Sequence, residues 1–246
     1  MQAVGKSHIG KVRLENQDAI YTNAEGLMAL PNLFVVADGL GGHSAGDIAS
    51  NRAMATFCDF FDNHKIDGEL NDSLTLALEA ANLQVYEDSC NNRRHRGMGT
   101  TFSAASILDG FLHYVHVGDS RIYAVDKSSA GINLIQLTND HFSYTADMVA
   151  EGLLTEAEAE DYPESVLTRA IGTDPDVTID KGKVPLSGVS FVLLCSDGLT
   201  NMVSNDDILG IINGNGTLEE KAEALIGAAL AGGGLDNISV ILITTD

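Results

Sequence analysis

The stretch TTFSAASILDGFLHYVHVGDSRIYAV, residues 100–125, decides the fold class. It holds three apolar segments rich in β-branched and aromatic residues, which predict strands at Thr100–Leu108, Phe111–Val117 and Arg121–Val125. No helical segment separates these strands, whereas neighbouring parallel strands need a long, usually helical, crossover. The stretch therefore predicts an antiparallel sheet.

The same strand pattern recurs on both sides of this stretch, at 18–22, 33–37, 132–137, 177–184, 189–195 and 238–244. Three helices are expected where a Ser or Thr precedes an acidic residue by three positions, at Ser44, Ser204 and Thr217. A fourth helix is predicted over 71–92, starting from Asn71 or Asp72. Strands and helices do not alternate regularly, so we expect an α+β fold with antiparallel sheets flanked by helices.

The sequence has no internal repeat and no Pro- or Ser-rich linker, which favours a single domain over residues 1–246. Between about 139 and 176 the strand pattern weakens. A short amphipathic piece at 144–151 is followed there by the acidic, turn-rich LTEAEAEDYPES. We expect this segment to form a small surface subdomain.

Charge and hydropathy exclude several classes of partner. Fourteen Lys and Arg against 35 Asp and Glu give a net charge of −21, which repels nucleic acid and anionic lipid. No apolar run reaches the roughly 18 to 20 residues of a membrane span, and the N-terminus lacks the apolar core of a secretory signal. Cys58, Cys90 and Cys195 lie far apart, which favours reduced, mostly buried thiols. We expect a cytoplasmic protein that binds neither nucleic acid nor membranes.

Four aspartates lie at the ends of the most apolar strands. Asp38 ends LFVVAD, Asp119 follows FLHYVHVG, Asp197 ends VSFVLLCSD and Asp236 precedes NISVILI. Taken singly, each is explained as a turn residue. Together, carboxylates at the ends of buried strands repel one another and favour a bound divalent cation. Oxygen ligands without Cys or His select Mg²⁺ or Mn²⁺ rather than Zn²⁺.

Eight blocks of sequence, in this order, carry a resemblance to a known family: GKVRLENQD, VVADGLGGH, GMGTTFSAA, HVGDSRIY, LTNDH, LTRAIGTDP, LLCSDGLTNMVSNDDI and GGGLDNISVIL. The chain resembles a bacterial member of the metal-dependent serine/threonine protein phosphatases of type 2C. The resemblance spans nearly the whole chain. It implies a four-layer α-β-β-α sandwich of two antiparallel sheets with helices outside, and a flap subdomain at about 139–176.

The resemblance also implies a set of metal ligands. Asp38, Asp197 and Asp236 match the ligands of one metal ion, and Asp38 would bridge to a second ion that the Gly39 carbonyl also holds. Asp119, together with Asp197, matches a weaker third metal site. The implied cofactors are two Mn²⁺ or Mg²⁺ ions and a possible third.

Further roles follow from the same resemblance. Asp18 matches an acid that orients metal-bound water, Arg13 matches the residue that grips the substrate phosphate, and Asn237 would hold Asp236 in place. The alternative for Arg13 is an exposed cation at a strand edge. His43 is the candidate general acid, although in family members with Asp-Gly-His the histidine directly follows the glycine. The alternative for His43 is a loop histidine.

The implied activity is hydrolysis of phosphoserine and phosphothreonine in proteins by direct attack of a water that bridges two metal ions. The substrates would be phosphoproteins made by a cognate serine/threonine kinase, and we expect a monomer. Gln17 stands where the family often has Glu, and Phe142 stands where Ser often follows Asp-His. Neither departure removes a metal ligand.

Three rival catalytic motifs occur. Gly42-His43-Ser44-Ala45-Gly46 matches the nucleophile elbow of serine hydrolases, but the preceding strand does not run directly into it. Cys90 and Arg96 have cysteine-phosphatase spacing without a glycine between them to cradle a phosphate. Asp174-Pro175-Asp176-Val177-Thr178 resembles an aspartate-nucleophile motif but reads as a turn. The non-enzymatic alternative, a metal-binding regulatory module with a decayed site, would lack some of the expected ligands.

Overall fold

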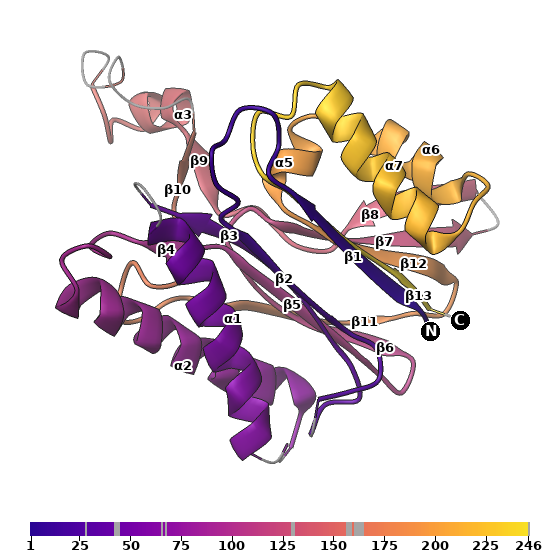
Figure 1. The fold of residues 1–246 in the computed structure, drawn as a ribbon, viewed down its shortest axis with the longest axis horizontal. Coiled ribbons are helices and arrows are strands. Elements are labelled where there is room, and N and C mark those ends of the chain that lie inside the picture. Colours follow the sequence, from indigo (N-terminus) through magenta and orange to yellow (C-terminus); the bar gives the residue numbers. More distant parts are fainter. Residues whose placement is uncertain are drawn as a thin grey trace.

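The computed structural model describes residues 1–27, 29–41, 45–64, 66, 68–128, 131–155, 159 and 165–245. Two antiparallel sheets lie face to face in its centre (Figure 1). The first sheet has the strand order β1 (Ala3–His8), β13 (Ile238–Thr244), β12 (Val189–Cys195), β7 (Arg121–Ser128), β8 (Gly131–Gln136). The second has the order β11 (Asp180–Pro185), β6 (Phe111–Val117), β5 (Phe102–Leu108), β3 (Leu33–Leu40), β2 (Asp18–Asn23), with β4 (Gly99–Thr100) paired to β3.

Strand β3 shows why its apolar run is continuous rather than alternating. Phe34 and Val36 are fully buried among side chains that both sheets contribute. Val35 and Ala37 point the other way and are buried with residues of the covering helices. Both faces of this strand are therefore packed, as in other strands at the centre of layered folds.

The helices cover the outer faces of the two sheets (Figure 1). Helices α1 (Ala45–Asn63) and α2 (Leu70–Asn91) pack on the second sheet. Helices α5 (Asp197–Thr200), α6 (Asn205–Asn213) and α7 (Leu218–Ala231) pack on the first. The predicted α+β class with two antiparallel sheets and flanking helices is confirmed.

Two of the predicted helix starts have the expected caps. Ser204 accepts a hydrogen bond from the Asp207 N–H, and Thr217 and Glu220 form a complete capping box. The start of α2 was predicted wrongly: the helix begins at Leu70, and its N-cap, Glu69, makes no side-chain capping bond. Leu70 is buried in the core, which explains why the helix already begins one residue before Asn71.

Several strand boundaries also differ from expectation. Strand β1 was not predicted, strand β11 begins at Asp180 instead of Val177, and the strand expected over 100–108 is divided into β4 and β5. The described part of the expected flap contains β9 (Phe142–Tyr144), paired with β10 (Ser165–Leu167), and α3 (Thr145–Ala150). This part projects from one end of the sandwich (Figure 1).

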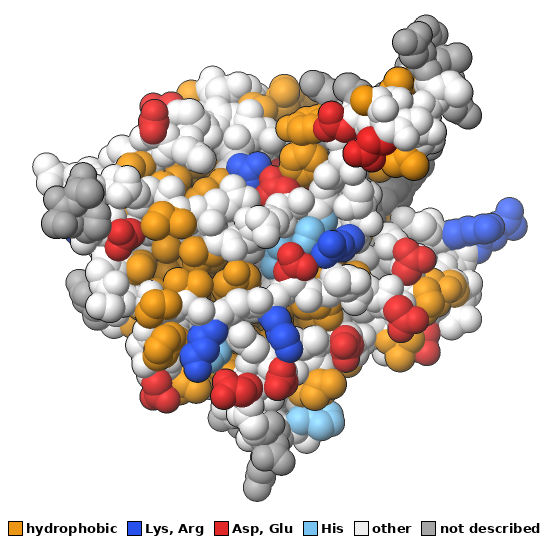
Figure 2. Space-filling view, turned by 180° about the vertical axis from the view of Figure 1, so that it is seen from behind, with side chains coloured by type: hydrophobic (Ala, Val, Ile, Leu, Met, Phe, Trp, Pro, Cys, Tyr) orange, Lys and Arg blue, Asp and Glu red, His pale blue; other side chains and the backbone are white. Residues whose placement is uncertain are grey.

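The acidic side chains in the view of Figure 2 are dispersed, and the three thiols differ in their exposure. Figure 2 shows acidic side chains scattered over the back of the molecule instead of gathered in one patch. All three cysteines are free, but only Cys195 is buried; Cys58 is half-buried and Cys90 is exposed, so the expectation of mostly buried thiols was wrong. Within the described ranges, no helix is long and apolar enough to cross a membrane.

Candidate active site

The topology brings the predicted acidic residues to one end of the sandwich. Asp18 and Asp38 are direct partners in the β2–β3 pairing. Asp197 follows β12 and Asp236 precedes β13, and these two strands are antiparallel neighbours, so the two aspartates lie at the same edge. Asp119 lies in the turn between β6 and β7. Two residues of each sheet thus face a common region, with Asp119 beside them.

Hydrogen bonds hold several of these carboxylates in place. Ser196 Oγ donates to Asp18 Oδ2 at 2.8 Å, and Asn201 Nδ2 donates to Asp197 Oδ2 at 3.0 Å. Arg13 Nη2 donates to Asp236 Oδ2 at 2.6 Å. Within the described ranges, no three Asp, Glu, His or Cys side chains are already arranged to hold a metal ion.

Two carboxylate oxygens nevertheless lack any donor. Among the described residues, Asp18 Oδ1 and Asp197 Oδ1 are buried with no hydrogen-bond partner. A buried carboxylate oxygen without a partner is unfavourable, and a cation is the usual compensation. With oxygen atoms as the only ligands, the donor set fits Mg²⁺ or Mn²⁺.

The electrostatics of the cluster point the same way. Burial, reinforced by the charges of Asp18, Asp197, Asp236 and Asp119, raises the pKa of Asp38 well above its usual range. Burial also raises the pKa of Asp18 to about 7 and that of Asp119 to about 7. The pKa of Asp197 is raised by burial and then by the charge of Asp236. Divalent cations among these groups would relieve that repulsion.

Asn237 contacts Asp236 through its backbone and the Arg13 loop through its side chain. Its backbone N–H donates to Asp236 Oδ1 at 2.8 Å, but its buried side chain binds the loop at 9–17. The Asn237 Nδ2 atom donates to the carbonyls of Ile9 and Glu15, and its Oδ1 accepts from the Gln17 N–H. The side chain therefore fixes the loop that carries Arg13 against the start of β13.

Arg13 lies at the mouth of the site. Its side chain is 55% exposed while it pairs with Asp236. A pocket of about 420 Å³ beside it is lined by Val12, Arg13, Leu14, Glu15, Gln17, Gly41 and Asn237. The guanidinium thus stands between the acidic cluster and solvent, where an incoming anion would meet it.

A second, more polar pocket of about 360 Å³ connects the cluster to the flap. Its lining includes Asp119 and Asp197, which were expected to share the weaker metal site, and Phe142, the departure from the family pattern. Arg121 and Asp140 also line it and form a bidentate ion pair with a shortest distance of 2.6 Å. This pair was not predicted from the sequence, although Asp140 belongs to the LTNDH block.

A histidine network at the base of the flap was also missed. His116 is fully buried between Ser103 Oγ, at 2.9 Å from its Nδ1, and the Asn139 carbonyl, at 3.0 Å from its Nε2. Its ring packs against His141, which accepts from the Gly118 N–H and lies 3.2 Å from Asp180. The network ties the segment that leads into the flap to β5 and β6.

This network leads to a pH prediction. Burial lowers the pKa of His116 to about 4, and the nearby His141 adds to the lowering. Between pH 6.5 and about 4 the unfolded chain therefore binds a proton that the folded chain does not, so stability falls as the pH falls. We expect His116 to contribute roughly 3 kcal/mol of this loss. Urea unfolding of the wild type and of His116→Gln at several pH values should show the wild type losing stability more steeply.

The exposed residue His64 provides the control for this comparison. The variant His64→Gln makes the same chemical change outside the network and should keep the steep pH dependence of the wild type. Parallel stability curves for the wild type and His116→Gln would contradict the assignment of this proton uptake to His116.

Two of the rival motifs can be judged from the structure. Cys90 lies in the last turn of α2, and the backbone N–H groups of Asn92, Arg94, His95 and Gly97 already have acceptors, so the backbone of this loop does not form the phosphate cradle of a cysteine phosphatase. Residues 174–176 form a turn whose carbonyls Asn82 holds. His43 and Ser44 lie outside the described residues, so the roles weighed for them stay predictions.

Residues 4–220 match the family model described as Protein phosphatase 2C. The match covers most of the chain, and the chain belongs to the protein phosphatase 2C family. This membership makes it a protein serine/threonine phosphatase and confirms the resemblance read from the eight sequence blocks.

Particular relatives agree. The chain is 36% identical over 241 residues to Protein phosphatase PhpP of Streptococcus pneumoniae. The alignment covers 96% of this chain and 94% of that protein. It resembles the structure of serine/threonine phosphatase Stp1 from Staphylococcus aureus, with a TM-score of 0.83, 30% identity and coverage of 100% and 95% of the two chains. The catalytic domain of phosphatase PstP in complex with two manganese ions is also similar, with a TM-score of 0.76, 31% identity and coverage of 98% and 96%.

Proposed function

We propose that this chain hydrolyses phosphoserine and phosphothreonine in proteins with two Mg²⁺ or Mn²⁺ ions held by Asp38, Asp197, Asp236 and the Gly39 carbonyl. The observation that carries the proposal is the carboxylate cluster, in which the two partnerless oxygens lie among groups with raised pKa values. Asp119 and Asp197 would hold a third, weaker ion. The structure of PstP with two manganese ions supports the metal requirement by similarity.

When bound, the ions would lower the pKa of a water that bridges them and stabilise the attacking and leaving oxygens of an in-line displacement. Asp18 Oδ1 is buried without a hydrogen-bond partner among the described residues, which suits it to orient that water through a hydrogen bond. Arg13 would bind two oxygens of the substrate phosphate with its guanidinium fork. Its exposed position on the loop that Asn237 fixes supports this role.

His43 remains our candidate for the general acid that protonates the departing serine or threonine oxygen. The proposed substrates are phosphoproteins produced by a cognate serine/threonine kinase, and a monomer is the proposed form of the enzyme. The acidic surface supports a need for local cations at the site, because a net charge of −21 repels a phosphate ester.

Removal of the metal tests the proposal. We expect EDTA to abolish hydrolysis of a phosphothreonine peptide and Mn²⁺ or Mg²⁺ to restore it, because oxygen ligands of this kind hold such ions reversibly. Alkylation of the thiols should leave hydrolysis of p-nitrophenyl phosphate unchanged, since no cysteine belongs to the proposed site. Full activity in excess chelator would sink the proposal.

The role of Arg13 has its own test. We expect Arg13→Ala to raise KM for a phosphothreonine peptide roughly tenfold to a hundredfold and to lower kcat less, because the phosphate is gripped in the ground state as well. Arg13→Lys should restore part of the affinity. Arg52→Ala is the matched control, since Arg52 also pairs with an aspartate, Asp88, but outside the site. An unchanged KM for Arg13→Ala would rule out this role.

A further inference from the structure

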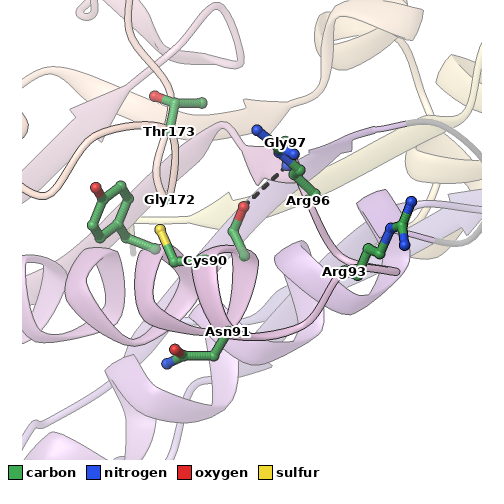
Figure 3. A pocket seen from close by; sticks show the side chains of 9 residues that line it. Cys90, Asn91, Arg93, Arg96, Gly97, Gly172 and Thr173 are labelled. Atoms are coloured by element: carbon green, nitrogen blue, oxygen red, sulfur yellow. Dashed lines mark hydrogen bonds between the residues drawn. The ribbon is translucent and has the colours of Figure 1, made fainter.

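A separate pocket of about 550 Å³ lies at the C-terminal end of α2. Figure 3 shows Arg93 and Arg96 on the loop that follows the helix, and Gly172 on the segment opposite Cys90. The complete lining is Tyr86, Ser89, Cys90, Asn91, Arg93, Arg96, Gly97, Gly172 and Thr173. None of these residues belongs to the carboxylate cluster or to the Arg13 loop.

The frame of this pocket is fixed by hydrogen bonds. Gly97 N–H donates to the buried Ser89 Oγ at 3.0 Å, which ties the loop to the helix (Figure 3). On the opposite side, Asn82 accepts from the Gly172 N–H and donates to the carbonyls of Asp174 and Pro175. Gly172 has φ +87°, and a Cβ on this residue would lie 2.2 Å from Val85 Cγ1. The pocket is therefore preformed.

Its charge is unusual for this molecule. Arg93, Arg94 and Arg96 are exposed, and within the described part of the chain their side chains make no ion pair. Among the described residues, seven of the other cations pair with acids: Lys6, Arg13, Arg52, Arg121, Arg169, Lys181 and Lys183. Asp88, in the last turns of α2, pairs with Arg52 and contacts His95 Nδ1. Three guanidinium groups without an ion pair among the described residues, in a chain of net charge −21, make this loop a local attractor for anions.

The pocket lies at the same end of the sandwich as the carboxylate cluster. Gly97 precedes β4, where Thr100 pairs with Gly39 and Gly99 pairs with Leu40. A Cβ on Gly99 would meet Thr173 Cγ2 at 3.0 Å, so the pocket wall packs directly on β4. At about 3.3 Å per residue and about 5 Å between strands, Gly97 at the edge of the pocket lies on the order of 10 to 15 Å from Asp38. About four extended residues cover that distance.

From this geometry we infer that the pocket binds a second phosphorylated residue of the substrate, about four residues from the one being hydrolysed. Arg93 and Arg96 would contact the phosphate oxygens through charge-assisted hydrogen bonds. The inference rests on the proposed function, because it defines the substrates of that same active site as multiply phosphorylated segments. It adds a recognition site in which no bond is broken.

Kinetics with paired peptides test this. One peptide carries phosphothreonine and, four residues away, a non-hydrolysable phosphonate analogue of phosphoserine. The control peptide has serine in place of the phosphonate. Both peptides are made with the second position either before or after the phosphothreonine. We expect the wild-type Mn²⁺ enzyme to have about tenfold lower KM for the doubly anionic peptide in one of the two orders. The double variant Arg93→Gln with Arg96→Gln should lose this preference but hydrolyse the serine peptide like the wild type.

Arg94→Gln is the matched control, because Arg94 has the same charge in the same loop but does not line the pocket. It should keep the preference of the wild type. If the wild type shows no preference in either order, or if the double variant keeps it, the inference is wrong, while hydrolysis of the serine peptide leaves the proposed function standing.

Binding without turnover gives an independent readout. In NMR spectra of the chain in EDTA, the doubly anionic peptide should shift the amide signals of Gly97 and Thr173, and the double variant should not show these shifts. If these shifts occur but the enzyme does not hydrolyse the peptide in Mn²⁺, the pocket binds the second phosphate group as inferred, but the proposed function is refuted. Inorganic phosphate alone should shift these signals only at much higher concentration. If it binds as tightly as the peptide, the occupant is the free ion and the inference is overturned.

Discussion

Replacing Asp38 by asparagine is expected to reduce activity about a thousandfold or more at saturating Mn²⁺. Asp38 is the ligand assigned to both ions, so the substitution removes a negative charge from each, and several kcal/mol of transition-state stabilisation is at stake. Initial rates on a phosphothreonine peptide, together with calorimetric titration of Mn²⁺, measure the effect. Asp119→Asn should leave the tight pair of ions in place and weaken only the looser third site.

The same substitution should have the opposite effect on the fold. In EDTA, Asp38→Asn should melt at a higher temperature than the wild type, because burial and four neighbouring carboxylates disfavour the charged form of Asp38. Replacement of a metal ligand should lower activity and raise stability in EDTA, whereas replacement of a structural residue should lower both. Activity within tenfold of wild type, or a less stable chain in EDTA, would contradict the assignment.

Gly39→Ala is expected to destabilise the protein by about 3 kcal/mol and to disrupt the site together with the fold. A Cβ at Gly39 would lie 2.1 Å from the Gly46 carbonyl oxygen and 2.6 Å from that of Gln17. Both obstacles are backbone atoms, so a side-chain rotation cannot relieve them. Urea unfolding in EDTA measures the loss without any contribution from metal binding.

Gly210→Ala supplies the control for that experiment. Gly210 lies within α6, and a Cβ there would meet nothing within 4 Å. Alanine should therefore stabilise the helix by about 0.5 to 1 kcal/mol. If Gly39→Ala is as stable as the wild type, then β3 and the start of α1 are less tightly packed than the structure indicates.

Local sequence predicted the elements whose own residues determine them. Strands Phe111–Val117, Val189–Cys195 and Ile238–Thr244 begin and end where their apolar runs do, and Thr217 with Glu220 forms the expected capping box. Strand β1 could not be predicted in this way, because AVGKSH has no clear alternation and its partner lies at the other end of the chain. Its existence depends on β13 rather than on its own residues.

The residues of the site also divide into those that local sequence predicts and those whose contacts depend on distant parts of the chain. Asp38, Asp119, Asp197 and Asp236 could be found because each lies two residues from the end of a strongly apolar strand, and the resemblance identified Asp18 and Arg13. The contact of Arg13 with Asp236, and the three bonds by which Asn237 holds the Arg13 loop, join residues 220 or more positions apart. No local pattern encodes such contacts. The pocket at Arg93 and Arg96 was hidden because its far wall, Gly172 and Thr173, belongs to a distant segment.

The pairing of the first strand with the last has a consequence for biosynthesis. Ala3 pairs with Ile243, so on the ribosome β1 has no partner until residues 238–244 emerge. Asn237, which fixes the Arg13 loop, arrives at the same moment. Before these residues leave the ribosome, a nascent chain lacks the contacts that hold the Arg13 loop in place, so we expect the proposed phosphate-binding loop to take its final form only after residues 237–244 have been synthesised.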